Sequence, residues 1–229
     1  MKTLLAAALL PVIVLMWYIR KLDKIEKEPF GFVMSIFACG AVTVISALIL
    51  ETVGEFILNI FLPQTSIVYL ALYYFIVVAG AEELGKYVML RLRTWRSPEF
   101  NYTYDAVVYS VAASLGFAAV ENILYVFQGG MSTAVLRALT SIPGHAMFAV
   151  FMGFHYGIAK AAESAGNTSV RDSEMRKALI VPILLHGFYD FSLSADGWFW
   201  ILLFFAFYLA AIIAAFLKIT QLSNEDHPV

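Results

Sequence analysis

The chain has 229 residues, of which 61% are hydrophobic and only 14% are charged. Soluble domains carry about 25% charged residues, so this deficit, together with a mean hydropathy of +0.79, indicates a protein that lies in a lipid bilayer. No basic patch interleaved with aromatic residues occurs, which argues against nucleic-acid binding. The single cysteine, Cys39, excludes an intramolecular disulfide.

A membrane-spanning helix needs about 20 mostly apolar residues. The sequence therefore predicts an all-α polytopic membrane protein with about seven spans in a single domain, 1–229. These spans are 3–19, 31–50, 67–90, 106–126, 138–159, 178–194 and 197–217. The first lacks a small-residue cleavage site before the charged residues that follow it, so we expect an uncleaved anchor. Glu51, Glu55 and Asn59 follow the second span at four-residue intervals, which predicts either an interfacial helix over 51–62 or a long extension of that span.

Lysine and arginine are distributed unevenly among the connecting segments. Basic residues follow the first, third, fifth and seventh spans: Arg20, Lys21, Lys24, Lys27, Arg91, Arg93, Arg96, Lys160, Arg171, Arg176, Lys177 and Lys218. The intervening segments contain only Arg137. Because cytoplasmic loops carry the excess of positive charge, we expect a cell-membrane protein with its N-terminus outside and its C-terminus in the cytoplasm.

The third predicted span contains two adjacent carboxylates, Glu82 and Glu83, and one cation, Lys86. A charge at the bilayer centre costs about 2.5–3.5 kcal/mol on insertion scales, so charges there usually mark a functional site. Glu82 and Lys86 are four residues apart on one helix face, which allows an ion pair, whereas Glu83 has no such partner. Two carboxylates this close in a low dielectric repel each other. One of them is therefore expected to hold a proton and to act as a general acid or base.

Three further apolar spans carry ionisable residues without comparable basic partners. Glu121 has no basic residue near it on its own helix, so its partner is expected from another helix, from water or from a metal ion. His145 follows Pro143 and Gly144, which are expected to interrupt the fifth span and to free the carbonyl group of Leu139. Broken helices at membrane depth are tolerated where they line a cavity.

His186 and Asp190 are four residues apart in the sixth span and share one helix face. The carboxylate can orient the imidazole, or both groups can point at one ligand. His155 has no such neighbours and is expected to be structural. We therefore expect the acids and imidazoles of four spans to meet around one hydrated pocket below the outer leaflet.

Four ordered motifs extend over most of the chain. They are E-E-x-x-K (Glu82, Glu83, Lys86), F-x-x-x-E (Phe117, Glu121), P-G-H-A (Pro143–Ala146) and H-G-x-x-D (His186, Asp190). In this order they resemble the PrsW family of intramembrane proteases, which looks distantly related to the type II CAAX prenyl endopeptidases. The resemblance implies an endopeptidase that cuts a single-pass membrane protein, an anti-sigma factor, on its extracytoplasmic side. This site-1 cleavage would be the first in a cascade that frees a stress-response sigma factor.

The resemblance also implies roles for individual residues. Glu82 or Glu83 would take a proton from water, and Glu82 is preferred by analogy to the first glutamate of the relatives. His186 and Asp190 match the relatives' oxyanion-stabilising pair; alternatively, Asp190 fixes the imidazole. Both roles agree with the needs of peptide hydrolysis, which are an activated water and a stabilised oxyanion.

The metal requirement stays open at this stage. Glu121, His145 and His186 form a two-histidine, one-carboxylate set of the kind that binds Zn²⁺ in hydrolases, but no H-E-x-x-H motif occurs. A metal-free glutamate mechanism fits about as well. The CAAX relatives carry an arginine, one residue further along, where this chain has Lys86, and a histidine where it has Glu121. The mechanism of those enzymes therefore does not transfer directly.

Two other classes of function are compatible with the same residues. A proton- or cation-coupled transporter would use the carboxylates and histidines as a relay, although no internal repeat is visible. A seven-helix receptor or assembly factor would need no chemistry, but it leaves the paired glutamates unexplained.

Overall fold

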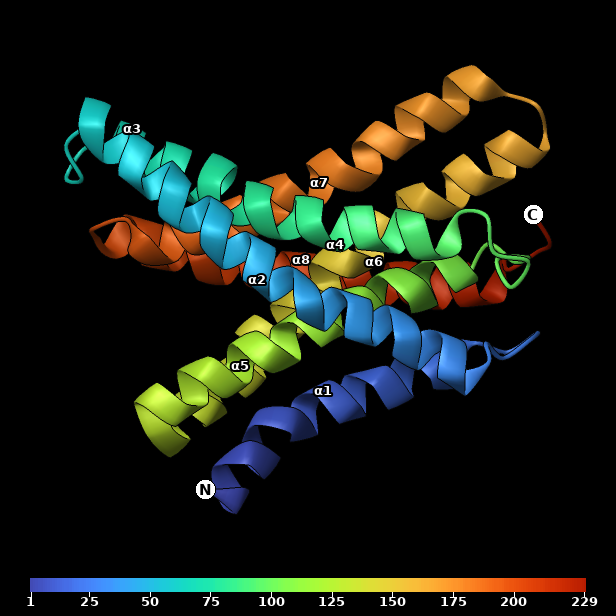
Figure 1. The fold of residues 1–229 in the computed structure, drawn as a ribbon, viewed down its shortest axis with the longest axis horizontal. Coiled ribbons are helices and arrows are strands. Elements are labelled where there is room, and N and C mark those ends of the chain that lie inside the picture. Colours follow the sequence, from blue (N-terminus) through green and yellow to red (C-terminus); the bar gives the residue numbers. More distant parts are fainter.

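A computed structural model describes residues 1–229 as a bundle of helices without a β-sheet (Figure 1). The elements in chain order are α1 (Lys2–Leu22), α2 (Phe30–Phe61), α3 (Ile67–Leu72), the π-helix η1 (Tyr73–Val78), α4 (Ala79–Thr94), α5 (Asp105–Leu139), α6 (Ser141–Ser164), α7 (Thr168–Ser194) and α8 (Trp198–Asn224). No loop separates α3, η1 and α4, so these three form one continuous rod.

Five segments are long and apolar enough to cross a membrane: Lys2–Leu22, Phe30–Phe61, Ile67–Thr94, Asp105–Ser164 and Trp198–Asn224. This confirms the all-α, polytopic membrane class. The predicted count of about seven spans is not confirmed, because α5 and α6 together form one of the five segments and α7 is not among them. Residues 51–62 continue α2 without a break, which selects the second of the two alternatives for this segment.

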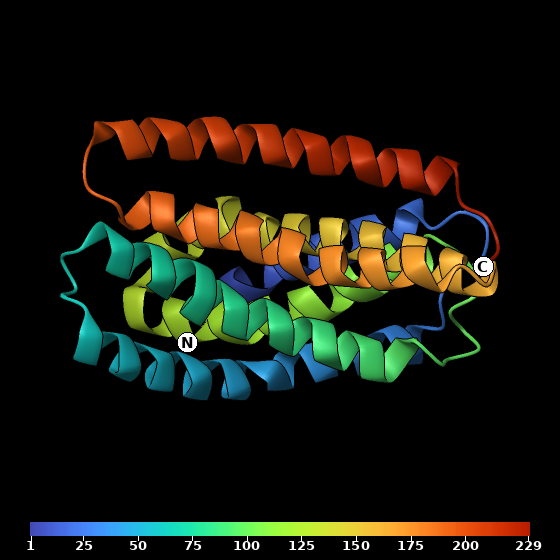
Figure 2. The same cartoon turned by 90° about the horizontal axis from the view of Figure 1, so that it is seen from above.

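Helix α5 lies at the centre of the bundle and packs against α1, α2, α4 and α6. Figure 2 shows α8 along one outer side, over α7, and α2 along the opposite side. The loops 23–29, 95–104 and 165–167 and the C-terminus lie at one end of the bundle, whereas the loops 62–66 and 195–197 lie at the other end (Figure 1). The basic connecting segments therefore share one end of the molecule.

Two glycines allow α2 and α5 to cross in direct backbone contact. A Cβ atom at Gly40 would lie 1.9 Å from the carbonyl oxygen of Ala113, and one at Gly116 would lie 2.0 Å from that of Phe37. Small residues at helix crossings are typical of membrane proteins, where close van der Waals packing replaces the hydrophobic effect. The crossing fixes the position of Phe117, the next residue of α5, whose ring contacts the central cation of the site.

Helix α5 reverses its direction at Gly130, whose φ of 76° is readily adopted only by glycine. The residues after it, 131–139, return towards the site. The chain is interrupted again at Thr140, so the predicted break lies three residues before Pro143, which occupies the first turn of α6. The carbonyl oxygen of Leu139 is available as expected, and it accepts a hydrogen bond of 2.7 Å from the hydroxyl group of Tyr208.

Candidate active site

A buried ammonium group lies at the centre of the polar cluster. Lys86 Nζ donates to Glu83 Oε1 at 2.8 Å, to Glu82 Oε2 at 3.1 Å and to His145 Nδ1 at 3.2 Å. It also lies 4.1 Å from the centre of the Phe117 ring, within cation–π range. The expectation that Glu83 lacks a partner is wrong, because side chains three residues apart on a helix also meet.

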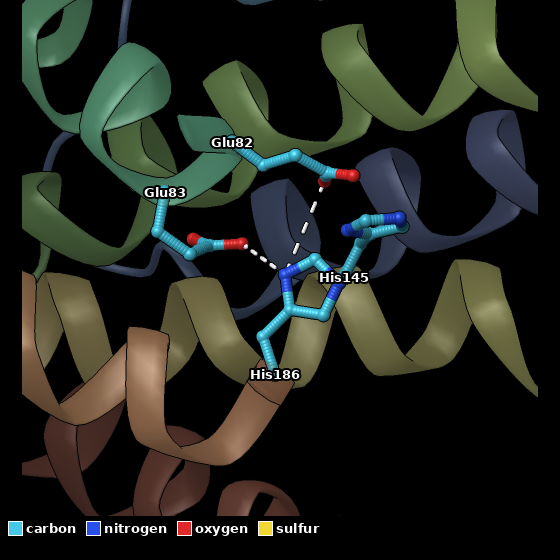
Figure 3. A group of neighbouring side chains, drawn as sticks. All are labelled: Glu82, Glu83, His145 and His186. Atoms are coloured by element: carbon cyan, nitrogen blue, oxygen red, sulfur yellow. Dashed lines mark hydrogen bonds and ion pairs between the residues drawn. The ribbon is translucent and has the colours of Figure 1, made fainter. Parts of the chain in front are cut away.

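His186 lies against both glutamates (Figure 3). Its Nδ1 atom is 2.9 Å from Glu83 Oε1 and 3.9 Å from Glu82 Oε2, and its Nε2 atom is 3.2 Å from Asp190 Oδ2. The ring stacks on Phe148 at 4.9 Å between centroids. With a carboxylate oxygen at each nitrogen, the ring donates at both positions only as the imidazolium cation. The expected contact between His186 and Asp190 is therefore present.

Glu121 joins the cluster through His145. The Nε2 atom of His145 is 3.0 Å from Glu121 Oε2, and Arg137 Nη2 donates to the same oxygen at 2.7 Å. Because an ammonium group can only donate, Nδ1 of His145 accepts from Lys86, and Nε2 carries the proton that goes to Glu121. A continuous chain of hydrogen bonds thus links α4, α6 and α5.

The expectation that these acids lack basic partners is corrected by Arg137. This residue counts as an outer-loop residue in the sequence, but the reversal at Gly130 returns it to Glu121, and its Nε atom also donates to Asn122 Oδ1 at 2.8 Å. The sequence contains a signal for this contact. The glycine pair Gly129–Gly130 is followed by Arg137, the one charged residue of the segment 127–137. Turn residues of this kind permit a hairpin that brings the two charges together.

The π-helix η1 directly precedes the glutamate pair. Single π-helical turns occur frequently at functional sites, where they shift the helical register of the residues that follow. Helix α7 approaches this turn closely, because a Cβ atom at Gly187 would lie 2.6 Å from the Phe75 ring and 2.8 Å from its Cα atom. The absence of a side chain at Gly187 therefore lets the neighbouring His186 reach α4.

A cavity of about 640 Å³ opens beside this cluster. Its polar lining consists mainly of Glu51, Glu82, Glu121, Arg137, His145, His186 and Asp190, together with tyrosines and hydroxyl groups of η1, α5, α6 and α7. Glu83 and Lys86 do not line the cavity, and Glu83 is completely buried. The two adjacent glutamates thus occupy different environments. Glu51 is a cavity residue that the motifs did not identify.

Four donor groups lie close enough to hold one metal ion. One ligand atom each from Glu82, Glu83, His145 and His186 lies within 4.8 Å of the others. Two imidazoles and carboxylate oxygens are typical zinc ligands, so the residues fit a divalent ion by type and by distance. The ammonium group of Lys86 bonds to three of these four groups, and an ion would have to displace it. Glu121 is not among these four residues. The ligand set Glu121, His145 and His186 therefore stays a prediction.

Comparisons with known proteins agree with the motifs. A family model described as PrsW family intramembrane metalloprotease matches residues 28–217. The chain is 33% identical to Protease PrsW of Geobacillus kaustophilus over 228 residues, which cover all of this chain and 96% of that protein. It is 33% identical to Protease PrsW of Bacillus subtilis over 218 residues, 91% of each chain. No solved structure matches. The chain therefore belongs to the PrsW family of intramembrane metalloproteases and is a membrane-embedded peptidase.

Proposed function

We propose that the chain cleaves a single-pass membrane protein, an anti-sigma factor, at the extracytoplasmic side of its span. This site-1 cleavage would begin the regulated proteolysis that releases a stress-response sigma factor. The observation that carries the proposal is the cavity, whose wall combines one accessible carboxylate of the glutamate pair with the imidazole of His186. A transporter gains no support from the family match, and no observation favours a receptor.

The distribution of charge supports the proposed side of cleavage. The basic loops gather at one end of the bundle, which we assign to the cytoplasm, with the N-terminus outside and the C-terminus inside. Many of the cavity residues come from the middle of their helices or from the end remote from these loops: 44–51 of α2, 117–125 of α5 and 186–194 of α7. A substrate would therefore be cut in the outer half of the membrane.

Glu82 is the proposed general base. Its Oε2 atom accepts from Lys86 at 3.1 Å, and its other carboxylate oxygen makes no bond within the protein and can accept a proton from a water in the cavity. Oε1 of Glu83 accepts from both Lys86 and His186, and this residue is withdrawn from the cavity. Glu83 is therefore proposed as a positioning residue that holds the ammonium and imidazolium groups in place.

The proposed reaction uses these groups in two steps. The water oxygen attacks the carbonyl carbon of the scissile bond while its proton passes to Glu82. The Nε2–H group of His186 turns from Asp190 to the developing oxyanion, while Glu83 keeps its bond to Nδ1 and holds the ring in position. The C–N bond then breaks as Glu82 returns the proton to the leaving nitrogen. A divalent ion bound by Glu82, Glu83, His145 and His186 would add Lewis-acid polarisation of the carbonyl group or the water.

The test is cleavage of a single-pass anti-sigma factor by the purified chain in detergent, followed by mass spectrometry of the fragments with and without a chelator. We expect two fragments separated at the outer end of the span, and a loss of about 10²–10⁴-fold in rate for Glu82→Gln. His155→Gln is the matched control, because His155 bonds to Glu174 and does not line the cavity. Wild-type rates for Glu82→Gln would reject the base. Absence of cleavage combined with ion flux in proteoliposomes would reject the peptidase function.

A further inference from the structure

One carboxylate of the cavity takes no part in the proposed chemistry. Glu51 reaches the cavity from α2 and forms no hydrogen bond or ion pair with any residue of the chain. The other three carboxylates that line the cavity each have a cationic partner at 2.7–3.2 Å. Those three are Glu82, Glu121 and Asp190. Glu51 is therefore the one lining carboxylate whose charge no neighbouring cation balances.

The surroundings of Glu51 are largely apolar. Of the 26 residues that line the cavity, 15 are hydrophobic, including Ala47 and Leu48 on the same helix. An isolated carboxylate in such surroundings costs free energy unless a cation or a hydrogen-bond donor pairs with it. A cavity that keeps one unpaired carboxylate among the residues that line it is therefore suited to bind a positively charged part of the substrate.

We propose that Glu51 forms a specificity subsite for a lysine or arginine side chain next to the scissile bond. This inference rests on the proposed peptidase function and names a feature of its substrate. A sphere of 640 Å³ is about 11 Å across, and Glu51 and Glu82 both line this cavity, so a long side chain next to a peptide bond held at Glu82 can reach Glu51. Lysine and arginine are rare inside membrane spans and extend their charged ends to the interface. A subsite of this kind would select the outer boundary of a substrate helix.

The experiment uses one single-pass substrate with Lys, Arg, Gln or Glu at each position that flanks the scissile bond. The wild-type chain should prefer Lys and Arg to Gln at one of these positions by about tenfold in kcat/KM, which corresponds to about 1.4 kcal/mol. Glu51→Gln should abolish this preference through a rise in KM for the Lys and Arg substrates. Glu51→Lys should reverse the preference towards Glu.

Glu55→Gln provides the matched control, because Glu55 lies one turn further along α2 and does not line the cavity. It should retain the wild-type preference. The subsite is rejected if the wild-type chain shows no preference for a basic side chain at any position, or if Glu51→Gln keeps that preference. If Glu51→Gln does not fold, Glu51→Asp and Glu51→Lys replace it, and the substrate series on the wild-type chain can still reject the subsite.

Binding to the inactive variant Glu82→Gln separates failure of the subsite from failure of the proposed function. If nothing is cleaved, the peptidase proposal fails, and the affinity of Glu82→Gln for the Lys and Gln substrates still tests the subsite. Equal affinities for the two substrates would reject the subsite. Tighter binding of the Lys substrate, lost when Glu51→Gln is added, would support it.

Discussion

Replacing Lys86 by methionine tests whether its ammonium group holds the site together. The substitution keeps the length of the side chain and removes a charge that bonds to Glu82, Glu83 and His145 at 2.8–3.2 Å. Removing one partner of a buried ion pair costs about 3–5 kcal/mol, because it leaves the other partner buried and unpaired. We expect the free energy of unfolding to fall by this amount and cleavage to be lost, since two adjacent carboxylates would then face each other without a cation.

A double-mutant cycle with Glu83→Gln isolates the electrostatic part of this loss. Lys86→Met combined with Glu83→Gln removes both charges, so the double variant should recover at least about 1–2 kcal/mol relative to the sum of the single losses. Unfolding in detergent, followed by tryptophan fluorescence during a denaturant titration, measures these differences. The control is Lys24→Met, an exposed residue bonded to Asn224, which should change stability by less than about 0.5 kcal/mol. Strictly additive losses, or wild-type stability for Lys86→Met, would refute this reasoning.

Three further predictions concern other parts of the molecule. Burial raises the pKa of Glu28, in the loop before α2, from 4.5 to about 7. The folded protein therefore holds a proton that the unfolded chain releases, so stability should fall as the pH rises from about 4.5 to about 7. Glu28→Gln should reduce this fall in thermal unfolding curves, and an unchanged pH dependence would contradict the assignment. Gly187→Ala should lower the free energy of unfolding by about 1–3 kcal/mol in denaturant titrations and should slow cleavage, because the new methyl group meets the backbone of Phe75. Wild-type stability would show that α7 can move away from η1 without cost. Lys86→Met should bind Zn²⁺ at least about tenfold more tightly than the wild-type chain in calorimetry, because it removes a cation that competes for the same donor atoms. Equal affinities of the two proteins would place the ion elsewhere.

The sequence predicts the helices better than it predicts their connections. Long apolar runs indicate spans because their backbone groups must be satisfied within the segment, and α1, α2 and α8 follow these runs. The reversal inside α5 depends on one backbone angle at Gly130, which lies in the connecting segment 127–137 between two predicted spans. Hydropathy therefore indicated a connection there, but it could not show that the residues after Gly130 form a helix that returns to the site.

The convergence of the site residues could be predicted from the rarity of charges in apolar spans. Glu82, Glu121, His145 and His186 come from four helices, and each needs a polar partner that the lipid cannot supply. Their partners could not be predicted, because Arg137 reaches Glu121 only through the reversal of α5. The motif also could not predict which of the two glutamates lines the cavity. Neighbouring residues on a helix point in directions about 100° apart, and the π-helix η1 shifts the register of both.

The geometry also explains why two adjacent glutamates serve the site better than one. A single carboxylate beside Lys86 would form a complete ion pair, and its oxygens would be engaged when a water arrives. Here Glu83 makes the shorter bond to the ammonium group, 2.8 Å against 3.1 Å for Glu82, and it also accepts from His186. Glu83 thus satisfies much of the positive charge from a position outside the cavity. Glu82 keeps one oxygen free at the cavity wall, which is the condition that a general base requires.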